Sequence, residues 1–277
     1  PRLAQRHPDA ATARKDSVRT FVIAEAGGTH DLDMAKALQL ISVSKQSGAD
    51  AYKIQYWSDS KRLAERRNAP DVADLYERCR IQAAWVAELS AVARGTGLAF
   101  MCTTYLQEDI HIVAPWVDRF KIASFEAQDE AFLLAHKPFG KPVIVSTGLC
   151  DEAAILDLTF YQHDSDWPVS LLHCISAYPT PFDQTNLRAI RDYGLDGFSD
   201  HTTSTLTGAL AVAAGATILE KHIRLEDTDP LNPDYGHSLP PDQFALYVQN
   251  VRLAEQAIGA GPRSVTEAPW ARFVVRP

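Results

Sequence analysis

Short apolar runs alternate with longer amphipathic stretches along the chain from Thr20 onward. Runs of about four to eight apolar residues are typical of buried strands, whereas helices repeat apolar positions every three or four residues. The short runs predict strands at 20–25, 51–56, 98–103, 119–123, 142–146, 169–173, 196–199 and 217–222. The longer stretches predict helices near 33–48, 71–95, 107–115, 128–135, 151–162, 184–193, 204–214 and 241–258.

Eight strand–helix pairs in a row predict an α/β fold, a (β/α)8 TIM barrel with a parallel sheet. We expect a single catalytic domain at 20–260, preceded by a flexible N-terminal arm at 1–19. The tail at 261–277 is too short for a further domain. An open doubly wound sheet is the alternative, but its first turn usually carries a Gly-rich phosphate-binding motif. The turn GGTHD at 27–31 lacks that glycine spacing.

Residues that favour helix ends stand at several of these boundaries. Asp33 and Asp151 are placed as N-caps, and Gly140 and Gly194 stand where helices should stop. The boundaries therefore support the division into strand–helix pairs.

Composition narrows the class of protein. Hydrophobic residues make up 46% of the 277 residues, as in a soluble globular domain with a sizeable core. The 35 acidic residues outnumber the 27 basic ones, and the net charge of -8 makes a surface for nucleic acid or an anionic membrane unexpected. The four cysteines form no CxxC pair and no transmembrane stretch stands out. Together these features predict a cytoplasmic protein with reduced thiols.

Lysines, hydroxyls and carboxylates follow several of the predicted strands. In a barrel the C-terminal ends of all strands meet at one mouth, where the chemistry takes place. Lys53 and Lys121 supply positive charge there and Ser146 supplies a hydroxyl, as a phosphate-bearing anion requires. Because burying an unpaired lysine is costly, Glu25 and Glu126 are expected as partners of these lysines or as ligands for the hydroxyls of a second substrate.

Two histidines close neighbouring apolar runs, His173 in VSLLHC and His201 in DGFSDHT. Neutral imidazoles are good ligands for divalent metals, so the pair predicts a metal site with open remaining positions. Glu25 and Asp234 are expected nearby. The alternative for each histidine is a hydrogen-bonded structural role, and Asp234 could belong to a surface turn because its loop is rich in Pro and Asp.

Several motifs occur in a fixed order along the chain: FVIAEAGGTHD, FKIASFE, KPVIVSTG, LLHCISAYPTP, GFSDHT, GATILEKH and NPDYGHSL. Together they resemble the sialic acid synthase family, the N-acetylneuraminate synthases and their legionaminic and pseudaminic relatives. The resemblance runs from about Phe21 to Gly259. It implies a TIM-barrel enzyme that condenses phosphoenolpyruvate with an open-chain amino sugar aldehyde, releasing phosphate and a 2-keto-3-deoxy (ulosonic) acid.

The resemblance also implies roles for individual residues. A divalent metal, Mn²⁺ in the first place with Mg²⁺ or Co²⁺ as alternatives, would be held by His173 and His201. Phosphoenolpyruvate would be surrounded by Lys53, Lys121, Ser124, Ser146 and Ser199, and the sugar would face Glu25, Gln55, Tyr178 and Asp234. The catalytic residues would be Glu126, near the reacting carbons, together with Lys121, Glu25 and His201.

The chain departs from the family pattern at four points that bear on the substrate: the turn Gly28-Thr29-His30-Asp31, Phe125 in place of a common Gly in the fourth-strand motif, Ser176 in place of an Asn of some relatives, and the C-terminus. Relatives continue beyond the position of Pro277 into a small antifreeze-like domain that reaches across a dimer, so the chain, which lacks that domain, is either truncated there or natively short. The resemblance implies a homodimer. Two other interpretations stay open: a Schiff-base pyruvate aldolase using Lys121 or Lys53, and a catalytically silent barrel that acts as a binding subunit.

Overall fold

The computed structural model describes residues 19–259. Eight parallel strands pair in sequence order and close into a barrel, because β1 pairs with both β2 and β8. The strands are β1 (Phe21–Glu25), β2 (Ala51–Tyr56), β3 (Ala99–Thr104), β4 (Arg119–Ile122), β5 (Val143–Ser146), β6 (Val169–Cys174), β7 (Gly197–Asp200) and β8 (Ile218–His222). The predicted (β/α)8 barrel is confirmed, and the alternative of an open doubly wound sheet is wrong. The predicted arm, except Arg19, and the predicted tail lie outside the described residues.

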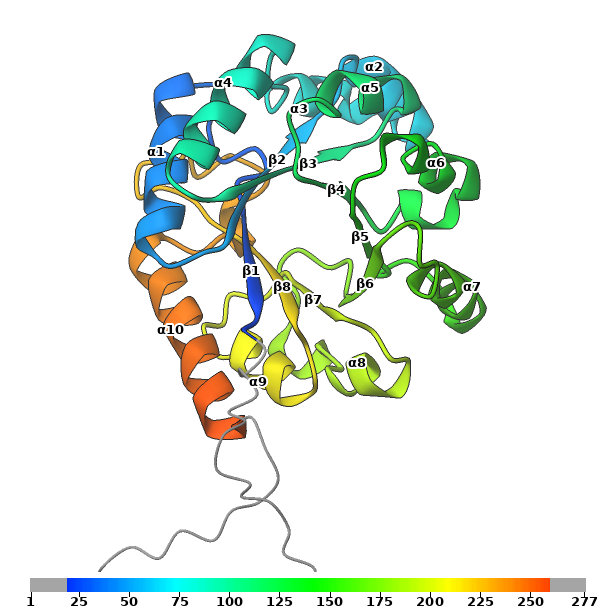
Figure 1. The fold of residues 1–277 in the computed structure, drawn as a ribbon. Helices are drawn as coiled ribbons and strands as arrows, with labels where there is room; N and C mark the ends of the chain where they lie inside the picture. Colours follow the sequence, from blue (N-terminus) through cyan, green and yellow to red (C-terminus); the bar gives the residue numbers. More distant parts are fainter. Residues whose placement is uncertain (1–18, 260–277) are drawn as a thin grey trace, which may run out of the picture.

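Helices surround the ring of strands on its outside (Figure 1). They are α1 (Met34–Gln46), α2 (Ser60–Arg66), α3 (Ala73–Glu77), α4 (Ala83–Gly95), α5 (Ile110–Val113), α6 (Glu130–Leu134), α7 (Glu152–Gln162), α8 (Arg188–Asp192), α9 (Thr207–Ala213) and α10 (Pro241–Ile258). The Asp33 and Asp151 side chains accept hydrogen bonds from backbone N–H groups of α1 and α7, which confirms both predicted helix starts.

One predicted helix, 71–95, is divided in the structure. A 3₁₀ turn and the short helix α3 precede α4, and α2 forms before them although the apolar pattern did not predict it. Asp59 caps α2 by accepting hydrogen bonds from the backbone N–H groups of Lys61 and Arg62. This long connection after β2 brings Arg67 and Tyr76 to the barrel mouth, where both line the cavity described below.

Side chains of the strands alternate between two apolar layers. Outward ones such as Val22, Phe100 and Leu219 are fully buried in the main core cluster with residues of the surrounding helices. Inward ones fill the lower part of the barrel: Ile23, Ala51, Met101, Ile144 and Leu172. Each fully buried aliphatic side chain contributes about 1.5–3 kcal/mol. These five inward side chains form an apolar floor in the lower barrel. The floor lies beneath the polar side chains at the C-terminal ends of the strands.

The long helix α10 follows β8 and packs against α9 and α1 (Figure 1). Its apolar face buries Phe244, Tyr247 and Val251. Gly208 of α9 faces Tyr247 so closely that a Cβ atom there would come within 2.4 Å of the aromatic ring. A glycine is therefore needed at this helix crossing.

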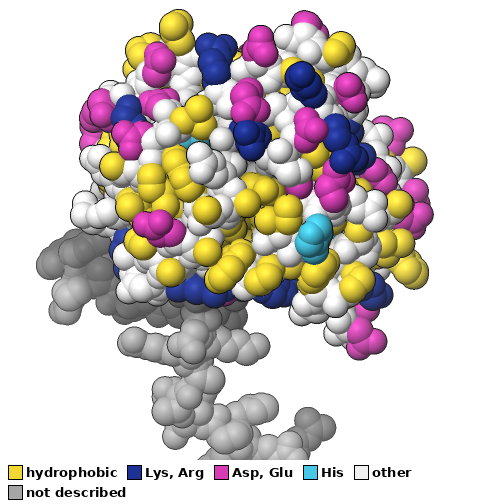
Figure 2. Space-filling model, turned by 90° about the horizontal axis from the view of Figure 1, so that it is seen from above, with side chains coloured by type: hydrophobic (Ala, Val, Ile, Leu, Met, Phe, Trp, Pro, Cys, Tyr) yellow, Lys and Arg dark blue, Asp and Glu magenta, His cyan; other side chains and the backbone are white. Residues whose placement is uncertain are grey.

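Acidic and basic side chains are interspersed with apolar ones on the face that Figure 2 shows. Neither sign of charge forms a large separate field on that face. Within residues 19–259, no helix combines the length and the apolar character that crossing a bilayer requires.

Candidate active site

A cavity of about 370 Å³ opens at the C-terminal ends of the strands. Every strand contributes to it: Glu25 from β1, Lys53 and Gln55 from β2, Thr103 from β3, Lys121 from β4, Ser146 from β5, Cys174 from β6, Ser199 from β7, and Glu220 and His222 from β8. Side chains on one face of a strand recur every second residue. Glu25 therefore lies directly above Ile23 of the apolar floor, and Lys53 above Ala51.

Two buried lysines form the charged centre of the cavity. The Nζ atom of Lys53 lies 2.8 Å from Glu25 Oε2 and 3.7 Å from Glu220 Oε2. The Nζ atom of Lys121 lies 3.9 Å from Glu220 Oε1. Glu220 therefore stands between the two lysines, and its Oε2 has no hydrogen-bond partner among the described residues.

The carboxylates affect the two lysines differently. Burial opposes the charge of Lys53, but Glu220 and Glu25 overcome this effect and raise its pKa. Burial lowers the pKa of Lys121, because Glu220 offsets the effect only in part and Lys53 adds repulsion. Burial raises the pKa of Glu25, whereas the two lysines bring the pKa of Glu220 below its usual value in spite of burial. The two carboxylates therefore stabilise the charge of Lys53 more than that of Lys121, which holds its proton less tightly than an exposed lysine does.

Hydroxyl groups surround the lysines. Lys53 Nζ donates a hydrogen bond to Thr103 Oγ1 at 2.9 Å, and Lys121 Nζ donates one to Ser146 Oγ at 2.7 Å. Ser199 Oγ donates to Glu220 Oε1 at 3.1 Å, and Ser124 Oγ accepts from Gly148 N at 3.0 Å. Cations and hydroxyl donors that converge on one cavity are suited to an anion with several oxygens.

A chain of hydrogen bonds connects the lysines to one wall of the cavity. Gln55 Nε2 donates to Glu25 Oε1 at 2.7 Å, and Tyr105 donates its hydroxyl proton to Gln55 Oε1 at 2.5 Å. These bonds fix the orientation of the Gln55 amide. The wall presents one carboxyl, one amide and one phenol to the cavity.

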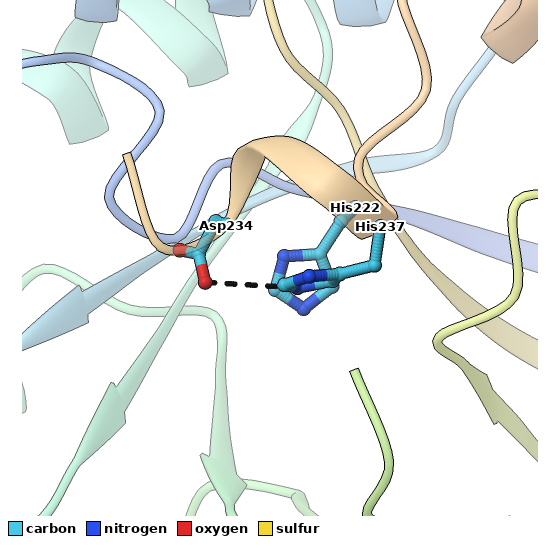
Figure 3. A group of neighbouring side chains, drawn as sticks. All are labelled: His222, Asp234 and His237. Atoms are coloured by element: carbon cyan, nitrogen blue, oxygen red, sulfur yellow. Dashed lines mark ion pairs between the residues drawn. The ribbon is translucent and has the colours of Figure 1, made fainter. Parts of the chain in front are cut away.

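Two histidines and one aspartate meet on another side of the cavity (Figure 3). His222, Asp234 and His237 can each offer one ligand atom such that all three atoms lie within 4.8 Å of one another. Burial lowers the pKa of His222 well below its usual value and that of His237 to about 3, so both imidazoles are neutral. His222 Nδ1 and His237 Nε2 are buried and have no hydrogen-bond partner among the described residues. We call these three residues the histidine–aspartate cluster.

The turn after β1 holds Asp234 in place. Gly28 N donates to Asp234 Oδ2 at 2.6 Å. Gly27 has a φ of +52°, and a Cβ atom on it would lie 2.2 Å from Asp234 Oδ2. Only a glycine permits this backbone conformation and this approach together. Gly27 and Gly28 therefore anchor the loop after β8 through their contacts with Asp234, although they do not form a phosphate-binding loop.

His201 lies beside this cluster. Its ring centroid is 5.5 Å from that of His222 and 6.0 Å from that of His237. Its Nδ1 atom is 3.0 Å from the carbonyl oxygen of Ile175, and the Tyr178 ring packs on it at 4.2 Å. His201 therefore lines the cavity next to the histidine–aspartate cluster, as expected for a residue near a metal site.

His173 does not join His201, so the prediction that these two imidazoles converge is wrong. His173 lies on the outer face of β6, where its ring stacks on Phe198 at 5.6 Å. Its Nε2 atom lies 2.8 Å from the carbonyl oxygen of Thr185. The next residue, Cys174, faces the cavity instead. The physical reason is the alternation along the strand: the polar residues Ser170 and His173 of this run stand on opposite faces, so the sequence does not show which face points inward.

Glu126 is also placed differently from the expectation. It is fully buried and is not among the residues that line the cavity. Both of its carboxylate oxygens accept from Arg67 Nη2, at 2.9 and 3.1 Å, so Arg67 lies at the cavity in its place. Burial raises the pKa of Glu126 to about 7, with Arg67 opposing the shift.

The remaining predicted site residues all line the cavity: Glu25, Lys53, Gln55, Lys121, Ser124, Ser146, Tyr178, Ser199, His201 and Asp234. Their individual roles stay predictions. Sequence reasoning missed Glu220, His222 and His237, which the structure adds to the site. A signal existed in the motif LEKH, where Glu220 and His222 stand two residues apart and so share one face of a strand.

The closed barrel, the lysine-lined cavity and the adjoining histidine–aspartate cluster are the features of a (β/α)8 enzyme with its site at the C-terminal ends of the strands. The chain belongs to the NeuB family, which matches residues 40–263. It is an enzyme of the sialic acid synthase type, which forms a carbon–carbon bond.

Individual relatives agree with this assignment. The N,N'-diacetyllegionaminic acid synthase of Legionella pneumophila is 33% identical and covers 92% of this chain and 77% of its own length. The pseudaminic acid synthase of Campylobacter jejuni is 32% identical, over 90% of this chain and 78% of its own. The crystal structure of N-acetylneuraminic acid synthetase from Leptospira borgpetersenii, in complex with citrate, superimposes with a TM-score of 0.82. It has 27% identity and covers 92% of this chain and 90% of that one.

Proposed function

We propose that this enzyme condenses phosphoenolpyruvate with an open-chain sugar aldehyde, giving an ulosonic acid and phosphate. The observation that carries the proposal is the pair of buried lysines, Lys53 and Lys121, which line one cavity and share the carboxylate of Glu220. The names of the relatives, synthases of legionaminic and pseudaminic acid, support a product of this class.

Phosphoenolpyruvate carries a phosphate and a carboxylate on a small carbon frame, so its site needs positive charge and several hydrogen-bond donors. Lys53 and Lys121 supply the charge, and the hydroxyls of Ser124, Ser146 and Ser199 supply donors around it. Charge-assisted hydrogen bonds of this kind are shorter and stronger than neutral ones. Glu220 keeps the lysines in place and limits their repulsion until the anion arrives.

The histidine–aspartate cluster fits a divalent metal. Two neutral imidazoles and a carboxylate are ligands that Mn²⁺, Co²⁺ and Zn²⁺ accept. Two buried nitrogens of the cluster, His222 Nδ1 and His237 Nε2, have no hydrogen-bond partner within residues 19–259. His222, Asp234 and His237 would hold the cation, with His201 beside them. Such a cation, when bound, polarises a carbonyl group as a Lewis acid.

The reaction has a simple balance of bonds and protons. C3 of the enolpyruvate attacks the aldehyde carbon, and the aldehyde oxygen takes up one proton. Water adds to C2 and gives up one proton, which leaves a hydroxyl group on C2. The bond between C2 and the phosphate oxygen then breaks, and the hydroxyl proton leaves with the phosphate, so that C2 becomes a ketone. Burial raises the pKa of Glu25, so this carboxyl is suited to hold the proton that the aldehyde oxygen needs.

The acceptor would lie between two walls of the cavity. Gln55 and Tyr105 form one wall, and Tyr178 with the histidine–aspartate cluster forms the other. Amide and hydroxyl groups on these walls can pair with the hydroxyls of a sugar. Glu126 lies behind Arg67, so we assign it no direct contact with the reacting carbons.

The test is to incubate the enzyme with phosphoenolpyruvate, Mn²⁺ and single aldoses from a panel, and to measure phosphate release and product mass. We expect phosphate to appear only with an aldose, together with a product whose mass equals both substrates plus water minus phosphoric acid. Phosphate release without a condensed product, or none with any aldose, would overturn the proposal. The second outcome is the one that a catalytically silent barrel predicts.

A Schiff-base aldolase is the second candidate, since burial lowers the pKa of Lys121 and so favours the free amine. That enzyme would use pyruvate and would need no metal. Borohydride added with pyruvate would then trap a covalent adduct on Lys121. We expect no adduct, because Lys121 is tied to Ser146 and lies near Glu220.

Metal dependence is tested separately. Treatment with EDTA should abolish phosphate release, and Mn²⁺ should restore it. Variants His222→Ala and His201→Ala should bind less Mn²⁺ in a direct titration while keeping their far-ultraviolet circular dichroism. Mn²⁺ as the resident ion, a homodimer and a cytoplasmic location stay predictions from the sequence.

A further inference from the structure

Arg67 is a cavity residue to which neither the motifs nor the proposed reaction gives a role. It follows the last turn of α2, in the long connection between β2 and α4, and its side chain is 23% exposed. Among the described residues that line the cavity, it is the one lysine or arginine besides Lys53 and Lys121. The cavity therefore has, besides its two lysines, an arginine whose positive charge is permanent.

Three neighbours hold the Arg67 guanidinium in a fixed position. Its carbon lies 4.4 Å from the centre of the Phe125 ring and 5.2 Å from that of Tyr105. Both oxygens of Glu126 accept from its Nη2 atom. Phe125 thus places an aromatic surface against the arginine. Arginine favours such stacking on a ring.

The contacts leave one edge of the guanidinium without a partner. Glu126 bonds only to Nη2, and no hydrogen bond from Nε or Nη1 is present among the described residues. Nε is buried and unpaired. An arginine offers five N–H donors in a planar fork, a geometry that matches the paired oxygens of a carboxylate or a phosphate.

The charge of Glu126 does not prevent Arg67 from binding an anion. Burial raises the Glu126 pKa to about 7, so near neutral pH this carboxyl is charged in only part of the molecules. When Glu126 is neutral, the charge of Arg67 faces the cavity without compensation. An anion bound there would in turn favour the protonated form of Glu126.

We propose that Arg67 is an anion-binding residue of this cavity, positioned by Phe125, Tyr105 and Glu126, and that it contacts phosphate or carboxylate oxygens of a bound substrate. The inference rests on the proposed function, because it takes the anion from the substrates of that reaction. Two sources have this chemistry: phosphoenolpyruvate itself, and an acceptor sugar that carries an acidic group.

Arg66 provides a matched control. It is the preceding residue, it pairs with Asp129 at 2.7 Å, and its guanidinium carbon lies 5.2 Å from the Phe132 ring. It therefore has an ion pair and an aromatic contact as Arg67 does, although Asp129 is 39% exposed and Glu126 is fully buried. It does not line the cavity. Loss of an ion pair and an aromatic contact should lower the melting temperature in both Arg66→Met and Arg67→Met, whereas loss of a contact in the cavity should weaken anion binding only in Arg67→Met.

The experiment is a calorimetric titration of the wild type, Arg66→Met, Arg67→Met and Arg67→Lys. The ligands are phosphoenolpyruvate, mannose and mannose 6-phosphate, and thermal melting is followed in parallel to show that each variant is folded. Loss of a charge-assisted hydrogen bond should weaken binding of the contacted anion about tenfold or more in Arg67→Met. Arg67→Lys should recover part of this loss, and Arg66→Met should bind like the wild type.

The two anions distinguish the source. Weaker binding of phosphoenolpyruvate in Arg67→Met assigns the contact to that substrate, and loss of a preference for mannose 6-phosphate over mannose assigns it to the acceptor. The inference is overturned if Arg67→Met binds both anions as tightly as the wild type. It is also overturned if Arg66→Met loses as much affinity as Arg67→Met, or if the wild type binds neither anion. If the wild type binds these anions through Arg67 but no aldose supports phosphate release, the proposed function fails and the role of Arg67 stands.

Discussion

Strand β8 carries Glu220 on its cavity side and Lys221 on its helix side, and the two residues belong to two different groups of buried charge. Glu220 joins Glu25, Lys53 and Lys121 at the barrel mouth, which we call the mouth cluster. Lys221 pairs with Asp200 of β7 behind the sheet at 3.0 Å, which we call the rear pair. Both groups are almost fully buried, so burial alone does not tell them apart.

The two groups differ in how many of their buried polar atoms have hydrogen-bond partners within the protein. In the rear pair, Asp200 accepts from Thr202 N and from the Thr207 hydroxyl, and Lys221 donates to the Thr202 carbonyl. In the mouth cluster, one oxygen of Glu220 has no hydrogen-bond partner among the described residues, and the group borders an open cavity. The comparison teaches that a buried charge cluster whose bonds are complete stabilises the fold, whereas an incomplete one indicates a ligand site.

The largest effect is expected from Lys221→Met in the rear pair. Removing one partner leaves the Asp200 carboxylate buried without its cation, which costs about 3–5 kcal/mol of the free energy of unfolding. Denaturant unfolding followed by circular dichroism measures the loss. The double variant Asp200→Leu/Lys221→Met should regain part of it, because no unpaired charge is left. If the single variant loses less than about 1 kcal/mol, the rear pair does not stabilise the fold as proposed.

Lys121→Met in the mouth cluster should have the opposite profile. We expect phosphate release to fall about 10²–10³-fold, as when one preorganised donor is removed from an active site. The free energy of unfolding should change much less than in Lys221→Met. The physical reason is that burial and Lys53 already act against the charge of Lys121, and Glu220 keeps Lys53 as a partner. A stability loss as large as that of Lys221→Met would erase the distinction between the two groups.

The Arg67–Glu126 pair lies between the two cases, since the carboxylate is fully buried and the arginine reaches the cavity. The pKa of Glu126 is raised from 4.5 to about 7, so the folded protein holds this proton more tightly than the unfolded chain. The free energy of unfolding should therefore fall as the pH rises from about 4.5 to 7, by an amount on the order of 1–3 kcal/mol. Above pH 7 this contribution should be constant.

Urea unfolding at a series of pH values measures this dependence. Glu126→Gln has no proton to lose, so the difference between wild type and variant should follow the same pH range. Asp129→Asn changes the neighbouring, more exposed ion pair with Arg66 and serves as the control. In this variant the free energy of unfolding should still fall between pH 5 and 7 as in the wild type. A flat difference between wild type and Glu126→Gln would mean that Arg67 keeps the carboxylate charged throughout.

Strand positions could be predicted from the sequence, but the direction of individual side chains could be predicted only in part. The eight apolar runs lie close to β1–β8, because buried parallel strands need continuous apolar sequence. In β2 the polar Lys53 and Gln55 stand two residues apart and show which face points inward. In β6 the polar Ser170 and His173 stand three residues apart, on opposite faces of the strand, so the run VSLLHC does not show which face points inward.

Contacts made by loops could not be predicted from the pattern at all. Arg67 reaches Glu126 across 59 positions of the chain, and Asp234 reaches Gly28 across 206. No local periodicity encodes such pairs. The choice between His173 and His222 as a metal ligand likewise depends on which imidazoles the closed barrel brings together.

His173→Phe should have the smallest effect, and it tests the comparison between the two faces of a strand. A phenyl ring keeps the stacking on Phe198 but loses the contact of His173 Nε2 with the Thr185 carbonyl oxygen, which costs about 1 kcal/mol of the free energy of unfolding. Mn²⁺ binding and phosphate release should stay at the level of the wild type, whereas His222→Phe should lose Mn²⁺ binding. If His173→Phe loses Mn²⁺ binding as fully as His222→Phe does, the outward direction of His173 is wrong. If His222→Phe instead binds Mn²⁺ like the wild type, the histidine–aspartate cluster is not the metal site.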